Sequence, residues 1–78
     1  DSTAMLERLL RSESRHLAKD AVNVLEAQRG SERGMSVSIL QRRLRIGYNL
    51  SCSILDEMET LGWIKENPAP ESFGYLII

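Results

Sequence analysis

Two segments with helical apolar spacing lie close together in the middle of the chain, and this arrangement constrains the fold most strongly. They cover 38–44 and 48–61, and the turn between them is short and ends in Gly47. Ser38 followed by Gln41 predicts a capping box, in which the two side chains bond to free backbone amides at the helix start. Two helices joined by so tight a turn form a helix-turn-helix.

The first third of the chain is predicted to be helical. No Pro or Gly occurs between Thr3 and Arg29, and Gly30 and Gly34 then bracket a predicted turn. The serines at 12–14 predict a break between a short leading helix and a second one, because serine favours helix ends over helix interiors. The apolar residues that recur at helical spacing are Leu6, Leu10, Leu17, Ala21, Val24 and Leu25.

The last part of the chain changes to a β pattern. Gly62 predicts the end of the second helix of the pair. Strands are predicted at 63–65 and 74–78, separated by a loop that contains Pro68 and Pro70. A hairpin that directly follows a helix-turn-helix has the position of a wing.

The order of these elements indicates a mainly α protein with a small β-hairpin, a winged helix-turn-helix. We expect a three-helix core plus wing in 15–78 and an extra N-terminal helical segment in 1–14, with a tiny β-tolerant segment at 35–37. At 78 residues the chain is long enough for one domain with one modest core. It opens with Asp-Ser-Thr and not with Met, as expected of a piece of a longer protein.

The second helix of a helix-turn-helix enters the major groove, where its exposed residues reach base edges. The apolar residues of this helix predicted to pack inward are Leu50, Ile54, Leu55, Met58 and Leu61. The opposite side carries Asn49, Ser53, Asp56 and Thr60, which we call the polar stripe. Asn can bond to adenine, Asp can accept from cytosine, and Ser can reach either kind of base. We therefore predict base contacts by Asn49, Ser53 and Asp56.

The polar stripe has no cation, so affinity for phosphate is expected from other residues. Arg42, Arg43 and Arg45 lie at the end of the preceding helix and in its turn, where such residues meet phosphates beside the groove. The alternative is that they complement the helix dipole and solvate the surface. A second basic stripe on the first helical stretch, either a solvated face or a docking surface, consists of Arg8, Arg11, Arg15 and Lys19.

The composition argues against several function classes. The net charge is −1, so any DNA binding must come from a local patch. One histidine, His16, and one cysteine, Cys52, make neither a metal site nor a catalytic set, and no Gly-rich phosphate loop is present. We expect no catalytic residue, metal or cofactor, and therefore no enzyme. A single cysteine suits the reducing cytoplasm, and no apolar run approaches the roughly 18 residues of a membrane span.

Individual residues outside the helix pair have simpler expected positions. The predicted wing loop, 67–73, has no Lys or Arg. Phe73 lies near its tip, where it either folds back on the core or contacts a partner. Trp63 is expected in the core, His16 at the surface or its boundary, and Cys52 as a buried structural thiol.

Residues 36–49 carry three motifs in succession: Ser-Val-Ser, Leu-Gln-Arg and Arg-Ile-Gly-Tyr-Asn. This segment resembles the C-terminal gamma domain of FtsK/SpoIIIE-type DNA translocases, in which the first motif is Ser-Ile-Ser. The similarity continues through 54–59 and 62–64 and covers about 17–66. The Arg-Ile-Gly-Tyr-Asn run is its most specific element, and the chain is similar to a divergent member of that family.

The resemblance implies a winged helix that recognises short sequences in duplex DNA, which orient the motor during chromosome segregation and cell division. It also implies a larger oligomeric parent protein and contact with a site-specific recombinase. The family's base-contacting residues correspond to Asn49, Ser53 and Asp56. Ser53 replaces an arginine, as does Leu50, which follows the Asn. An arginine that bonds to guanine contributes about 1–3 kcal/mol of discrimination, which serine cannot supply.

Two functions therefore compete. The first is DNA binding through the polar stripe and the three arginines, which predicts an affinity that falls steeply with salt. The alternative is a winged-helix protein–protein interaction module that has lost DNA binding. Its support is the cation-free stripe and wing, together with apolar contact area at Leu50, Phe73 or the first helix.

Overall fold

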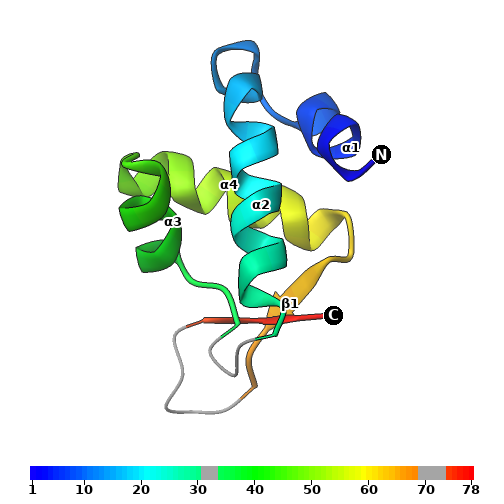
Figure 1. Cartoon of the computed structure of the whole chain (residues 1–78), viewed down its shortest axis with the longest axis vertical. Helices are drawn as coiled ribbons and strands as arrows, with labels where there is room; N and C mark the ends of the chain where they lie inside the picture. Colours follow the sequence, from blue (N-terminus) through cyan, green and yellow to red (C-terminus); the bar gives the residue numbers. More distant parts are fainter. Residues whose placement is uncertain (31–33, 69–73) are drawn as a thin grey trace.

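The computed structural model describes residues 1–30, 34–68 and 74–78. The elements in chain order are α1 (Ser2–Leu9), the 3-10 helix η1 (Ser12–Leu17), α2 (Ala18–Gln28), α3 (Val37–Leu44), α4 (Tyr48–Thr60), β1 (Ile64–Glu66) and β2 (Tyr75–Ile77). Helix α2 crosses α4, with α1 towards one end of the molecule and the hairpin at the other (Figure 1). The mainly helical winged-helix fold predicted from the sequence is confirmed. The predicted break after a short leading helix is present, but it falls at residues 10 and 11, and the serines at 12–14 lie in η1.

One apolar core joins the helices. Leu6 and Leu10, from the first ten residues, are buried in the same cluster as Leu25 of α2 and Ile54 of α4. The other buried apolar residues of this cluster are Ala18, Ala21, Val24, Met35, Leu40, Leu55, Met58 and Ile64. The helical spacing thus identified the buried faces, with Leu17 half-buried at the edge. The division into an extension at 1–14 and a domain at 15–78 stays a prediction, with α1 packed against α2 and α4.

The start of α3 differs from the sequence-based expectation. The N-cap is Ser36, whose backbone is extended and whose Oγ accepts a hydrogen bond from the Ile39 amide at 3.3 Å. The capping box predicted at Ser38 is therefore wrong. Met35 pairs with Tyr75 through backbone hydrogen bonds of 2.9 and 2.7 Å, which keep the chain extended until Ser36. The helix can begin only after that pairing ends.

Two glycines allow this pairing of Met35 with Tyr75. Gly34 has φ +67, and a Cβ there would collide with the Tyr75 carbonyl oxygen. A Cβ on Gly74 would lie 2.9 Å from the Met35 carbonyl oxygen. Both positions require the absence of a side chain, because two backbones approach closely. The pairing connects the entry to α3 with the second strand of the wing.

The wing is a two-stranded antiparallel hairpin in which Ile64 lies opposite Ile77. The two strands lie within one residue of the predicted segments, and the Ile78 amide extends the pairing by donating to the Trp63 carbonyl oxygen at 2.9 Å. The predicted turn at 31–33 and the predicted position of Phe73 lie outside the described residues.

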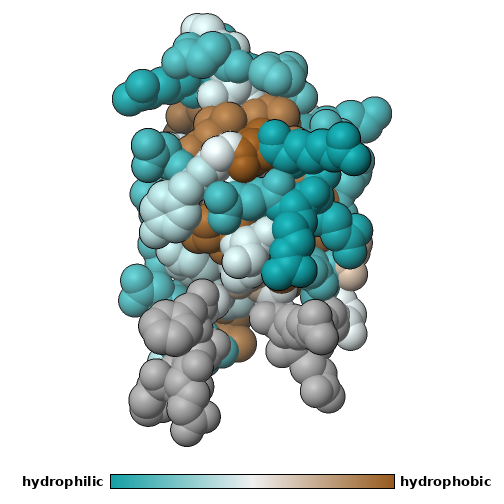
Figure 2. Space-filling view, turned by 90° about the vertical axis from the view of Figure 1, so that its left-hand side faces the viewer, coloured by the Kyte–Doolittle hydropathy of each residue, from teal (hydrophilic) through white to brown (hydrophobic). Residues whose placement is uncertain are grey.

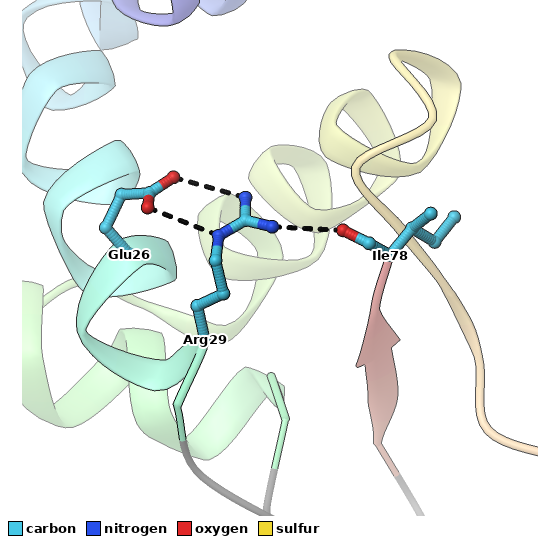
Figure 3. Close-up of polar contacts among 3 residues, drawn as sticks. All are labelled: Glu26, Arg29 and Ile78. Atoms are coloured by element: carbon cyan, nitrogen blue, oxygen red, sulfur yellow. Dashed lines mark hydrogen bonds and ion pairs between the residues drawn. The ribbon is translucent and has the colours of Figure 1, made fainter.

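Arg29 ties the last strand to the end of α2. Its Nη1 donates to the Ile78 carbonyl oxygen at 3.0 Å, and its Nε and Nη2 bind the Glu26 carboxylate at 3.2 Å (Figure 3). Both side chains are about half exposed, so the ion pair itself stabilises the fold by less than about 1 kcal/mol. The hydrogen bond to Ile78, the residue after β2, links the end of α2 to the hairpin.

Candidate nucleic-acid interface

Helix α4 has a buried side and a polar side, as predicted. Ile54, Leu55 and Met58 are buried, and Leu50 and Leu61 are half-buried against the core. All members of the polar stripe, Asn49, Ser53, Asp56 and Thr60, are exposed. The steps of three and four residues between them place these side chains on one side of the helix.

An open groove of about 600 Å³ runs along this side of α4, between the helix and the link from α1 to η1. Its lining, which defines what we call the α1–α4 groove, consists of Leu9, Leu10, Arg11, Glu13, Ser14, Asn49, Leu50, Ser53, Asp56 and Glu57. The structure thus brings together the three residues predicted to contact bases. Thr60 does not line the groove, and its hydroxyl donates to the Asp56 carbonyl oxygen at 3.0 Å.

The three arginines predicted to bind phosphate are exposed but lie outside the groove. Arg42 and Arg43 are in the last turn of α3, and Arg45 is its C-cap. In the described part of the chain none of the three has a hydrogen-bond or ion-pair partner. Strongly hydrophilic side chains cover much of the face that α3 and the start of α4 present (Figure 2). The guanidinium groups of Arg42, Arg43 and Arg45 are therefore available to an external anion.

Arg45 has an unusual backbone. Its φ of 54 and ψ of 48 lie in the left-handed region, where it is the only non-glycine residue among those described. Helices often end with one residue in this conformation, and that residue is usually glycine because a Cβ costs energy there. Arg45 adopts this conformation two residues before Gly47, the N-cap of α4, and so places a charge in the turn between the two helices.

Tyr48 is a surface residue that sequence reasoning did not select. It is the first residue of α4, it precedes Asn49, and 63% of it is exposed. A hydrogen bond with the Cys52 side chain, followed by the charge of Cys52 and burial, raises the pKa of Tyr48. Tyrosine hydroxyls are among the groups that contact phosphate and sugar. The signal available in the sequence was its place at the helix start, next to a predicted base-contacting residue.

The remaining candidates have the following positions. Cys52, expected to be a buried thiol, is only half-buried because it lies at the edge of the buried side of α4. His16 is exposed, and Trp63 is half-buried and packed against the core. The basic stripe on the first helical stretch is exposed, and in it Arg15 donates from Nε to the Leu10 carbonyl oxygen at 3.3 Å.

Within 1–30, 34–68 and 74–78, no helix is long and apolar enough to cross a membrane. In the same ranges, no three His, Cys, Asp or Glu side chains are grouped so that they could hold a metal ion.

The charges on the α1–α4 groove are unequal. Glu13, Asp56 and Glu57 line it, whereas Arg11 is the one cation among its lining residues. A ligand in this groove meets an acidic surface, and a nucleic acid there would gain from hydrogen bonds to base edges more than from attraction to phosphate. Arg42, Arg43 and Arg45, at the end of α3, lie outside it.

Comparison with known protein families decides the assignment. The model of the FtsK gamma domain matches residues 13–69. The chain belongs to the FtsK gamma domain family. As a gamma domain it is a DNA-binding regulatory winged helix of FtsK-type DNA translocases, which act in chromosome segregation, and its partner is double-stranded DNA. Comparisons with curated proteins and with solved structures gave no significant match. The family match begins within η1, so α1 lies outside it.

Proposed function

We propose that this gamma domain recognises short orienting sequences in duplex DNA by placing α4 in the major groove. Asn49, Ser53 and Asp56 contact base edges, and Arg42, Arg43 and Arg45 contact phosphates. The observation that carries the proposal is the exposure of these three polar residues along one groove-lining side of α4. Each is of a type that bonds to bases, and the helix-turn-helix geometry presents such a face to DNA.

The residue types predict a defined kind of target. Asn49 favours adenine, Asp56 accepts from the amino group of cytosine, and Ser53 discriminates weakly. The target would therefore contain an adenine and a cytosine, contacted by side chains about two turns of α4 apart. Ser53, in place of the family's arginine, removes the strongest contact with guanine, so the target differs from that of arginine-containing relatives.

The test is selection of bound sequences from a random duplex pool, followed by fluorescence anisotropy at low and moderate salt. We expect an enriched sequence and an affinity that falls with salt, because each phosphate contact releases counterions. Asn49→Ala should remove the preference at one base pair. Binding that is equal for enriched and scrambled duplexes would contradict sequence recognition, and an affinity independent of salt would contradict the phosphate contacts.

A second function is favoured by the acidic groove. Glu13, Asp56 and Glu57 line the same groove as the partly exposed Leu9, which suits a protein segment that carries positive charge. In this alternative the domain is a protein–protein interaction module, and a site-specific recombinase is one partner of that kind. A domain that retains a protein partner, and that binds enriched and scrambled duplexes equally, would support this function over recognition of orienting sequences.

We also propose that the domain acts in the cytoplasm, without catalytic activity, as part of an oligomeric parent. Several copies on one assembly would raise the effective concentration of each copy near DNA. Weak binding by a single domain would then suffice. Joining two copies of the domain by a flexible linker should increase the affinity for a duplex with two targets far more than for one target.

A further inference from the structure

We infer that Arg11, at the junction of α1 and η1, contacts the phosphate backbone along the α1–α4 groove when DNA is bound. This inference rests on the proposed DNA recognition by α4 and adds to it a contact from an element outside the family match. Residues 13–69 match the family model, and α1 and Arg11 lie before the matched range.

Arg11 is positioned beside the residues that are proposed to contact bases. Arg11 lines the same groove as Asn49, Ser53 and Asp56, although it comes from a segment about forty residues earlier in the chain. Figure 1 shows α1 and η1 towards one end of the molecule and the hairpin at the other, with α4 crossing between them. A duplex on the polar stripe of α4 would therefore have the wing on one flank and the α1–η1 junction on the other.

The charge of Arg11 is available to a ligand. Arg11 is exposed, and no hydrogen bond or ion pair of its guanidinium occurs within the described residues. Its neighbours differ, since Arg15 donates to the Leu10 carbonyl oxygen and Arg29 is paired with Glu26. The carboxylates that share the groove with Arg11 are all more than an ion-pair distance away, so they reduce its field without occupying its donors.

The backbone of Arg11 is held in place by its neighbours. Arg11 is the N-cap of η1, and its carbonyl oxygen accepts from the Ser14 amide at 2.8 Å. Leu10 and Ser14, on either side of it, are buried. The Cα of Arg11 is therefore held in place while its side chain makes no cap hydrogen bond. A substitution there removes the charge without removing a contact that the fold uses.

The polar stripe explains why a cation here matters. None of its members is basic, and Asp56 and Glu57 repel phosphate at the same groove. Arg42, Arg43 and Arg45 lie at the end of α3 and outside the groove. Arg11 is the cation that lines the groove among the described residues, on a flank that these arginines do not cover, and it can bring one strand of the duplex against α4.

The test compares Arg11→Gln with Arg8→Gln, using a labelled duplex of about two helical turns selected by the wild-type chain. Arg8 is also exposed on α1 but does not line the groove, so both variants have the same net charge. We expect Arg11→Gln to weaken binding about fivefold to tenfold near 0.1 M salt, and to lower the slope of log affinity against log salt by about 1. Arg8→Gln should change the slope much less.

Each outcome has a defined meaning. Equal losses in the two variants would show a general effect of net charge and would overturn the contact. If Arg11→Gln removed only the preference for one base pair of the target, Arg11 would contact a base, and the phosphate assignment would be overturned. Failure of the proposed function itself would appear earlier, as an absence of salt-dependent binding by the wild-type chain. Unchanged thermal unfolding of both variants would confirm that the fold is intact.

Discussion

Replacing Arg45 by glycine should make the domain more stable and a weaker DNA binder at the same time. Arg45 sits near the centre of the left-handed region, with φ 54 and ψ 48. A Cβ in this conformation costs roughly 1–2 kcal/mol. Glycine removes that strain but gives back about 0.5–1 kcal/mol through the greater freedom of the unfolded chain. The net gain in the free energy of unfolding is about 0.5–1 kcal/mol.

For a domain of this size, that gain raises the melting temperature by roughly 2–8 °C. The same substitution removes one cation that we assign to phosphate, so DNA affinity near 0.1 M salt should fall about fivefold to tenfold. Thermal unfolding followed by circular dichroism gives the first quantity, and fluorescence anisotropy with the selected duplex gives the second. The two measurements move in opposite directions, which a general loss of folding could not produce.

Arg45→Ala is the matched control, because it removes the charge and keeps a Cβ in the left-handed conformation. It should lose the same affinity as Arg45→Gly without the gain in stability. If Arg45→Gly binds DNA as well as the wild type, Arg45 makes no phosphate contact. If its melting temperature does not exceed that of Arg45→Ala, the backbone at this position is not strained as we argue.

Three further predictions concern single residues. Asn49→Ala should reduce discrimination at one base pair by about 1–3 kcal/mol in competition binding, whereas Thr60→Ala should have little effect, since its hydroxyl bonds to the Asp56 carbonyl oxygen. Gly34→Ala should lower the free energy of unfolding by at least about 2 kcal/mol, because a Cβ at positive φ would collide with the Tyr75 carbonyl oxygen. Urea titration measures this loss, and a loss under about 1 kcal/mol would contradict the collision. Burial, followed by the charges of Asp56 and Glu59, raises the pKa of Tyr75. The protonated phenol therefore contributes stability that is fully present below about pH 10, the pKa of the unfolded chain. This contribution is lost as the pH rises through the higher pKa of the folded state. Tyr75→Phe should therefore lose less stability than the wild type between neutral and strongly alkaline pH in urea titrations.

Local patterns predicted those features that depend on neighbouring residues. The helical spacing of apolar residues identified the buried side of α4, and Gly62, with φ +81, ends that helix region as expected. The polar stripe followed from the same spacing, because a helix that buries one side exposes the other. These inferences need only the residues within one segment.

The features that sequence reasoning missed depend on contacts between distant segments. Ser36 and Ser38 are equally suitable as N-caps by residue type, and the pairing of Met35 with Tyr75 decides between them. Leu6 and Leu10 could be predicted to be buried, but not that their helix would border the polar stripe of α4. The left-handed backbone of Arg45 was hidden because Gly47, two residues later, is the residue type expected to end a helix.

The proposed recognition of specific sequences agrees with the distribution of charge on the domain. The chain has a net charge of −1, and the groove that borders the polar stripe carries three carboxylates and one arginine. A free protein with this surface would bind DNA weakly, because non-specific affinity comes mainly from phosphate neutralisation.

A domain attached to a translocating motor is already close to DNA, and strong non-specific attraction would hold it at every position along the duplex. Acidic residues beside Asn49 and Asp56 would reduce that attraction while leaving hydrogen bonds to bases, so the ratio of specific to non-specific binding would rise. Glu57→Gln, which removes one of these charges, should therefore increase affinity for scrambled duplexes more than for the selected target.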